Sequence, residues 1–248
     1  MALTSAQRQF YQDKGYVVVE NLIEPAMLRQ LRDRITEIAQ AAAQERGVPV
    51  PGQVGYEPGS ATAAPGKKAP LRKLNSLAAH DEFFRSVAML PEILDIAAEL
   101  TGSAGPLLLY DDQAFLKPAF AGSEKPLHQD NSYFRMEPHD AAVTCWIAVD
   151  DSTLENGCMR YIPGSHKLGL LPHKALSAAH LTPEAPFDPN DEIPAPVGAG
   201  GAIFHHLLCL HSSRANTSPR SRRAWALHIA NPAGKSPVKP PEKMLKLR

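Results

Sequence analysis

The chain lacks the features that mark disulfide-rich, membrane-spanning or nucleic-acid-binding proteins. Its 248 residues include three cysteines, none in a Cys-x-x-Cys pair, so a disulfide framework is not expected. The formal net charge is zero, which excludes a general electrostatic attraction to nucleic acid or to anionic membranes. No apolar run reaches the length of a membrane span, and no basic segment followed by an apolar stretch indicates a secretory signal. We therefore expect a cytoplasmic protein with no membrane insertion.

What the chain does have is the material for one sizeable core and two long loops. Apolar residues make up 44% of the sequence, and the length suits a single domain without internal repeats. Its 23 prolines and 16 glycines are densest in residues 46–70 and 183–201. Segment 46–70 is either a loop at the mouth of a site or a plain connector. We also expect residues 167–197, which overlap the second of these stretches, to form an insertion that covers the opening of the site.

The pattern of elements divides the chain into three parts within one domain, residues 1–248. Helical spacing of apolar residues predicts a brace over about 4–100. Short apolar and β-branched runs predict a β core over about 105–231. Strands that follow a helical region indicate an antiparallel barrel or jelly roll with flanking helices. Residues 235–248 are basic, which predicts either a solvated tail or a contact with an anionic partner.

The most informative segment for function is Pro126-Leu127-His128-Gln129-Asp130, because it contains a His-x-Asp pair. On a strand, side chains two residues apart leave the same face, about 6.6 Å apart along the backbone. An imidazole nitrogen and a carboxylate oxygen at this spacing can converge on one metal ion. Two histidines and one carboxylate around open positions are typical of non-haem Fe(II) oxygenases. The hypothesis therefore requires a second histidine from a distant strand.

Histidines at 205, 206 and 211 compete for that position on the residues alone. Eleven residues after His211 comes Arg222. A guanidinium binds a carboxylate through two parallel hydrogen bonds, which a 2-oxo acid co-substrate would need at its far end. A lone His-x-Asp is weak evidence, but His-x-Asp followed by a distant histidine and then an arginine at this spacing is much stronger.

This combination resembles the phytanoyl-CoA dioxygenase family of Fe(II)/2-oxoglutarate oxygenases. The likeness covers roughly residues 8–231 and extends through Trp146-Ile147-Ala148-Val149-Asp150-Asp151, Glu155-Asn156-Gly157-Cys158, Ile162-Pro163-Gly164-Ser165-His166-Lys167 and His211-Ser212-Ser213. The resemblance implies a mainly β protein with flanking helices around a double-stranded β-helix, the cupin-like jelly roll. It also implies that the metal ligands are His128, Asp130 and His211, because Ser213 and Arg222 hold the family's spacing from His211.

The same resemblance implies further contacts to the co-substrate. It places Ser213 with Arg222 at the distal carboxylate and adds Trp146, Gln113 and Lys73 as pocket residues. Each of the last three has an ordinary alternative: a core tryptophan, a polar strand residue and a solvated lysine. Residues 143–149 alternate in the manner of a strand, with Val143 and Ile147 on one face and Trp146 on the other.

The expected cofactors are Fe(II), 2-oxoglutarate as co-substrate and O2. The implied reaction is hydroxylation of an unactivated C–H bond of a small organic molecule, with release of succinate and CO2. The alternatives are a hydroxylase of an acyl-CoA thioester, a metal-dependent isomerase or hydrolase, and a catalytically silent binding domain on the same fold. The prime substrate and the oligomeric state are not determined by the residues.

Overall fold

The computed structural model describes residues 2–43, 54–57, 70–177, 180–185 and 187–248. The α-helices are α1 (Ser5–Lys14), α2 (Pro25–Ala43), α3 (Leu77–His80), α4 (Glu82–Ala88), α5 (Pro91–Thr101) and α6 (Asn131–Phe134). The 3-10 helices are η1 (His139–Ala141), η2 (Ser165–Leu168), η3 (Pro189–Asp191) and η4 (Pro241–Lys243). The strands are β1 (Tyr16–Val19), β2 (Val54–Tyr56), β3 (Leu71–Asn75), β4 (Leu108–Lys117), β5 (Lys125–His128), β6 (Ala142–Ala148), β7 (Met159–Tyr161), β8 (His173–Ser177), β9 (His180–Pro183), β10 (Ile193–Ala195), β11 (Ala202–His206), β12 (His211–Ser213), β13 (Arg222–Ala230) and β14 (Leu245–Lys246).

Within the described residues the strands form a large sheet, a small sheet and a hairpin, all antiparallel. The large sheet runs β1-β11-β6-β13-β4-β3-β2, with β14 also paired to β4, and the small sheet runs β10-β7-β12-β5. Neighbours in both sheets come from distant parts of the sequence, as β11 beside β6 and β12 beside β5 illustrate. This architecture confirms the predicted double-stranded β-helix core with flanking helices.

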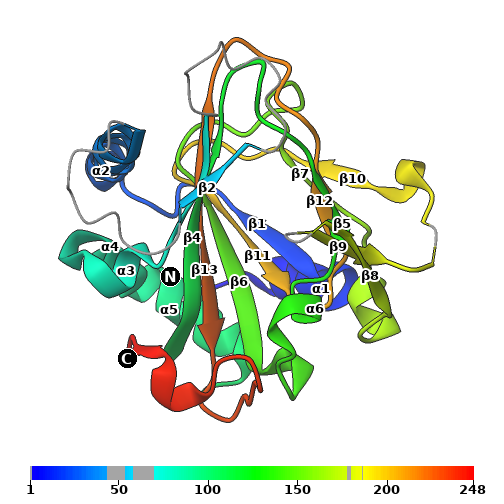
Figure 1. Cartoon of the computed structure of the whole chain (residues 1–248). Coiled ribbons are helices and arrows are strands. Elements are labelled where there is room, and N and C mark those ends of the chain that lie inside the picture. Colours follow the sequence, from blue (N-terminus) through cyan, green and yellow to red (C-terminus); the bar gives the residue numbers. More distant parts are fainter. Residues whose placement is uncertain (1, 44–53, 58–69, 178–179, 186) are drawn as a thin grey trace.

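Helices cover one face of the large sheet (Figure 1). Leu31 and Ile35 of α2 and Ile93 of α5 are fully buried in one cluster with the apolar side chains on that face of the sheet. The alternation predicted for residues 143–149 is confirmed, because Val143, Cys145, Ile147 and Val149 belong to this cluster. Helices from the predicted brace thus form the layer behind the sheet, whereas β1, β2 and β3 from the same part of the chain are strands of the sheet itself.

The opposite face of the large sheet packs against the small sheet, which lies on the other side of it from the helices (Figure 1). Trp146 and Ala148 on β6 share a second cluster with Met159 and Tyr161 on β7. Burying apolar side chains on both faces makes β6 a fully buried strand, which all seven of its residues confirm. The space between the two sheets is where the candidate ligands lie.

The segment expected to cover the opening has more structure than a loop. Within residues 167–197, β8 and β9 form a hairpin, and β10 joins the small sheet. Most of segment 46–70 lies outside the described residues. Its described part includes β2, which pairs with β3 at the edge of the large sheet.

The basic C-terminal segment is docked, and the expectation of a solvated tail is wrong for its last residues. Leu245 and Lys246 pair with β4, and Leu247 is 1% exposed in the core under the helices. The apolar residues between the basic ones explain the difference, because they supply a packing face that the charge pattern alone conceals.

Candidate active site

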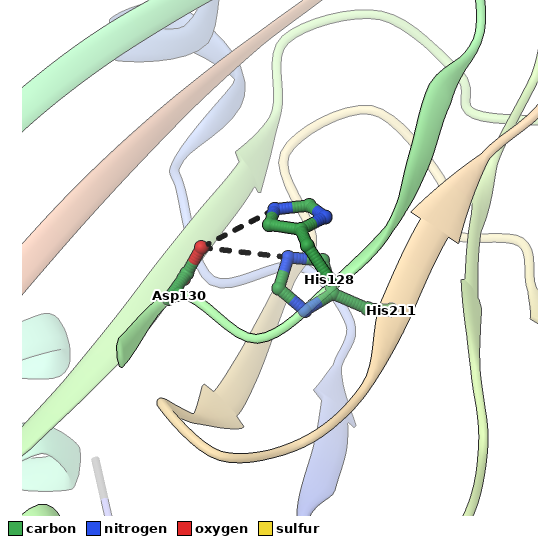
Figure 2. Close-up of side chains that lie close together, drawn as sticks. All are labelled: His128, Asp130 and His211. Atoms are coloured by element: carbon green, nitrogen blue, oxygen red, sulfur yellow. Dashed lines mark ion pairs between the residues drawn. The ribbon is translucent and has the colours of Figure 1, made fainter. Parts of the chain in front are cut away.

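The three candidate metal ligands meet between the two sheets (Figure 2). The Asp130 Oδ1 atom lies 3.5 Å from His128 Nε2 and 3.6 Å from His211 Nε2. One ligand atom from each of the three residues falls within 4.8 Å of the others, and all three side chains are buried. His128 and His211 occupy paired positions on β5 and β12, which is how residues distant in sequence come to share a site.

Asp130 reaches the site by a route that differs from the predicted one. The strand ends at His128, and Asp130 has φ of −57° and ψ of −36°, the conformation of a helix, at the start of α6. Gln129 between them turns away, and its side-chain amide donates to Gly169 O and Leu208 O. The turn from strand into helix thus aims the carboxylate at the histidines, where the regular strand that we expected is absent.

The hydrogen bonds of the two histidines leave lone pairs facing the carboxylate. Nδ1 of His128 lies 2.8 Å from Pro126 O, and Nδ1 of His211 lies 2.9 Å from Cys209 O. A carbonyl oxygen only accepts, so each Nδ1 carries the proton and each Nε2 presents a lone pair. Burial lowers the pKa of His128 to about 4, which favours this neutral form.

Three electron-pair donors therefore converge with no proton between them. Such a set repels itself unless a cation lies at its centre. Two imidazoles and one carboxylate with further positions open are the donor set that suits Fe(II). The residues present thus fit the metal that the chain's pattern predicts.

A layer of polar side chains behind Asp130 fixes its carboxylate. Its Oδ2 atom accepts hydrogen bonds from Thr144 Oγ1 at 2.7 Å and from His205 Nε2 at 3.1 Å, which leaves Oδ1 for the metal. His205 Nδ1 lies 2.9 Å from the Tyr161 hydroxyl, and His228 Nδ1 lies 2.9 Å from Thr144 Oγ1. His205 competed with His211 for the ligand position on sequence alone, and the structure places it behind the carboxylate.

Sequence reasoning missed Thr144 and His228 altogether. Both His205 and His228 occupy positions paired with Thr144, one on each neighbouring strand. The alternation of side chains along β6 could have identified Thr144, because it places Thr144 on the same face of the strand as Trp146.

Arg222 lies at the first position of β13 with its side chain buried. Its guanidinium carbon is 5.1 Å from the centre of the Trp146 ring, and its Nη1 donates to Gly157 O at 3.1 Å. Among the described residues Nε has no hydrogen-bond partner, and no carboxylate lies within ion-pair distance of the guanidinium. Burial lowers the pKa of Arg222 to about 10, so the group is still a cation at neutral pH. A buried cation with a free donor is suited to an anionic ligand.

All eight residues selected from the sequence line one cavity of about 490 Å³. Besides the three ligands and Arg222 they are Ser213, Trp146, Gln113 and Lys73. Gln113 donates from Nε2 to Asp111 Oδ2 at 3.1 Å, and Lys73 Nζ lies 5.8 Å from the centre of the Phe115 ring. By contrast, His166 is not among the lining residues, and its Nε2 atom lies 3.2 Å from Gln12 O on α1.

The facing sheets and this donor set are those of a non-haem iron oxygenase, and the buried Arg222 guanidinium in the same cavity suits an oxo-acid co-substrate. Comparison with known proteins identifies the group within that class. The model of the phytanoyl-CoA dioxygenase (PhyH) family matches residues 11–224. The chain belongs to this family and is an Fe(II)/2-oxoglutarate-dependent dioxygenase that requires Fe(II), 2-oxoglutarate and O2.

Curated relatives agree with that assignment, and a solved structure shares the fold. The phytanoyl-CoA dioxygenase domain-containing protein 1 of Danio rerio is 28% identical over 92% of this chain and 90% of its own. The Rattus norvegicus protein of the same name is 34% identical over 64% of this chain, and the match spans 57% of that protein. The fold is also that of EvdO2 from Micromonospora carbonacea in complex with 2-oxoglutarate, at 22% identity and a TM-score of 0.71, covering 96% of this chain and 94% of that one.

No helix among the described residues combines the length and the hydropathy that crossing a bilayer requires.

Proposed function

We propose that His128, Asp130 and His211 hold the iron of this dioxygenase, and that it hydroxylates a free small organic molecule at an unactivated C–H bond. The observation that carries the metal assignment is the convergence of two Nε2 lone pairs and one carboxylate oxygen, with both Nδ1 protons held by backbone carbonyls. Bound there, iron would supply O2 activation coupled to the decarboxylation of 2-oxoglutarate to succinate. Thr144 and His205 keep Asp130 oriented with Oδ1 toward the metal.

In this proposal Arg222 anchors the distal carboxylate of 2-oxoglutarate, with Ser213 beside it. The support is a buried guanidinium that rests on Trp146 and keeps Nε without a partner among the described residues. Gln113 and Lys73 complete the walls of the same cavity. A cavity of about 490 Å³ lies in the range of small-molecule sites, and it must hold both co-substrate and substrate. A free small substrate therefore fits better than one bound to coenzyme A.

The test is Arg222→Met in the iron-loaded enzyme, with Arg220→Met as the matched control. Arg220 is exposed and two residues away. Loss of a charge-assisted hydrogen bond predicts a KM for 2-oxoglutarate raised by about tenfold to a hundredfold in the first variant and unchanged in the second. Succinate release at limiting 2-oxoglutarate measures this. Equal KM values in both variants would remove Arg222 from the co-substrate site and favour a reaction that uses the triad without an oxo acid.

The proposal also includes a cytoplasmic location, because a formal net charge of zero gives the chain no general electrostatic attraction to anionic membranes. Fractionation of cells that produce the native protein, followed by immunodetection, tests it. Recovery in the membrane or organelle fraction would overturn this part alone.

A further inference from the structure

A second group of hydrogen-bond donors lines the cavity, contributed by elements other than the one that carries Arg222. Arg72 comes from β3, Lys125 from β5, Tyr133 from α6 and His180 from β9. The ring of Tyr133 packs edge-on against that of His128, with centroids 5.8 Å apart. This group therefore lies beside the metal ligands, while Arg222 rests against Trp146.

The hydrogen bonds in this group leave donors without acceptors. Arg72 Nη2 lies 3.0 Å from His180 Nε2, and because a guanidinium only donates, that imidazole nitrogen accepts and orients the arginine. The Tyr133 hydroxyl oxygen accepts from Lys125 Nζ at 3.0 Å and from Leu181 N at 2.8 Å. Both of its lone pairs are then occupied, so the hydroxyl proton is left to donate to another group.

The two cations of this group also have no anionic partner among the described residues. Among the described residues, no carboxylate lies within 4.0 Å of the charged nitrogens of Arg72 or Lys125. Of the described residues that line the cavity, Asp130 alone carries a carboxylate, and it faces the histidines. Burial, and after it the neighbouring Arg72, lower the pKa of Lys125 to about 7, and the more distant Asp130 offsets only part of this effect. An anion at this point would offset the repulsion.

We propose that Arg72, Lys125 and Tyr133 bind an oxyanion of the prime substrate, so that the enzyme acts on a small organic acid. The inference rests on the proposed function, because it takes 2-oxoglutarate to occupy the Arg222 end of the cavity. The acid group is a carboxylate or a phosphate monoester, since both present oxygens to a guanidinium, an ammonium and a hydroxyl. Binding there places the carbon skeleton next to His128, at the metal.

The experiment is calorimetry without oxygen on the iron-loaded protein saturated with 2-oxoglutarate. The probes are butanoate, hexanoate and octanoate, each paired with its amide and with the alkyl phosphate of equal length. We expect an acid or a phosphate to bind about tenfold more tightly than its amide, the value of one charge-assisted hydrogen bond. The arm that binds more tightly identifies the oxyanion. Equal binding of acid, phosphate and amide, or no binding of any probe, overturns the proposal.

Variants separate the charge from the packing of the side chain. Lys125→Met should remove the preference for the charged probe, Lys125→Arg should restore it, and Tyr133→Phe should weaken it by a few-fold. Lys174→Met is the matched control, because Lys174 is exposed on the hairpin and outside the lining of the cavity. A preference that survives both Lys125→Met and Arg72→Met overturns the inference.

Two further outcomes separate this inference from the function on which it rests. If the preferred probe binds only when 2-oxoglutarate is omitted, the cluster serves the co-substrate and the inference fails alone. If 2-oxoglutarate itself gives neither heat nor a visible charge-transfer band with the iron-loaded protein, the proposed function fails.

Discussion

The two ends of the cavity are built from different parts of the fold. Arg222 belongs to β13, which has β4 on one side and β6 on the other in the middle of the large sheet. Lys125 belongs to β5, the edge strand of the small sheet, and Arg72 to β3, one strand from the edge of the large one. The first guanidinium is 2% exposed, whereas the second group is only half-buried.

The difference shows where the fold fixes chemistry and where it leaves room to change. A strand with a neighbour on each side cannot shift without breaking two sets of backbone hydrogen bonds, so the end that we assign to 2-oxoglutarate is rigid. Edge strands and hairpins tolerate substitution and insertion, and binding residues on them can vary over a constant scaffold. The anchor that we assign to 2-oxoglutarate thus lies on a central strand, whereas the group that we assign to the substrate lies at or next to the edges of the sheets.

Removing the carboxylate between the two ends should have the largest effect. Asp130→Ala deletes the one anionic ligand, and we expect iron binding and succinate release to fall to background. Metal content after anaerobic reconstitution measures the first, and Asp140→Ala is the control, because Asp140 is an exposed carboxylate ten residues away. Full iron content in Asp130→Ala would contradict the ligand assignment.

A smaller loss is expected when the support behind Asp130 is weakened at the rigid end. Thr144→Val keeps the shape of the side chain and removes the donor 2.7 Å from Oδ2. Loss of such an outer partner lowers metal affinity by about tenfold to a hundredfold. Competition with a chelator measures the affinity, and Thr144→Ser, which retains the hydroxyl, should behave as the native protein. A valine variant with native affinity would mean that His205 alone orients the carboxylate.

The smallest effect is expected at the edge end. Gln129 lies between His128 and Asp130 and is fully buried. Its side chain donates to Gly169 O and accepts from Leu171 N, so it ties the proposed ligands to the segment that precedes the β8–β9 hairpin. Gln129→Leu should raise the KM of an identified substrate by about fivefold, equivalent to about 1 kcal/mol, and change that of 2-oxoglutarate less. Steady-state kinetics with each ligand varied in turn will measure both. An equal rise in the two values would show that the ends of the cavity are not independent.

Much of the fold could be predicted because its signals are local. The alternation in residues 143–149 identified a strand with two faces, and the structure buries each face against a different layer. Thr4 and Gly15 frame α1 as cap and stop, the latter with φ of 82°. Apolar spacing and turn residues act over a few positions, which a sequence displays directly.

What the sequence did not reveal depends on register between distant strands. Thr144, His205 and His228 meet because β6 pairs with β11 on one side and β13 on the other in a particular alignment. The second cation group likewise needs β3, β5 and β9 to surround one cavity. No spacing along the chain encodes these alignments, since a shift of one residue would turn every side chain to the other face.

The pairing of His128 with His211 has a consequence for the stability of the protein. β5 has four residues and β12 has three, so few backbone bonds hold these strands together. An ion bound by both rings, as we propose, would link these two short strands and would favour the folded chain over the unfolded one by mass action. Loss of iron would then abolish activity and also weaken the pairing of β5 with β12. The edge strand β5 would become accessible to proteases, and the lifetime of the protein would be shorter.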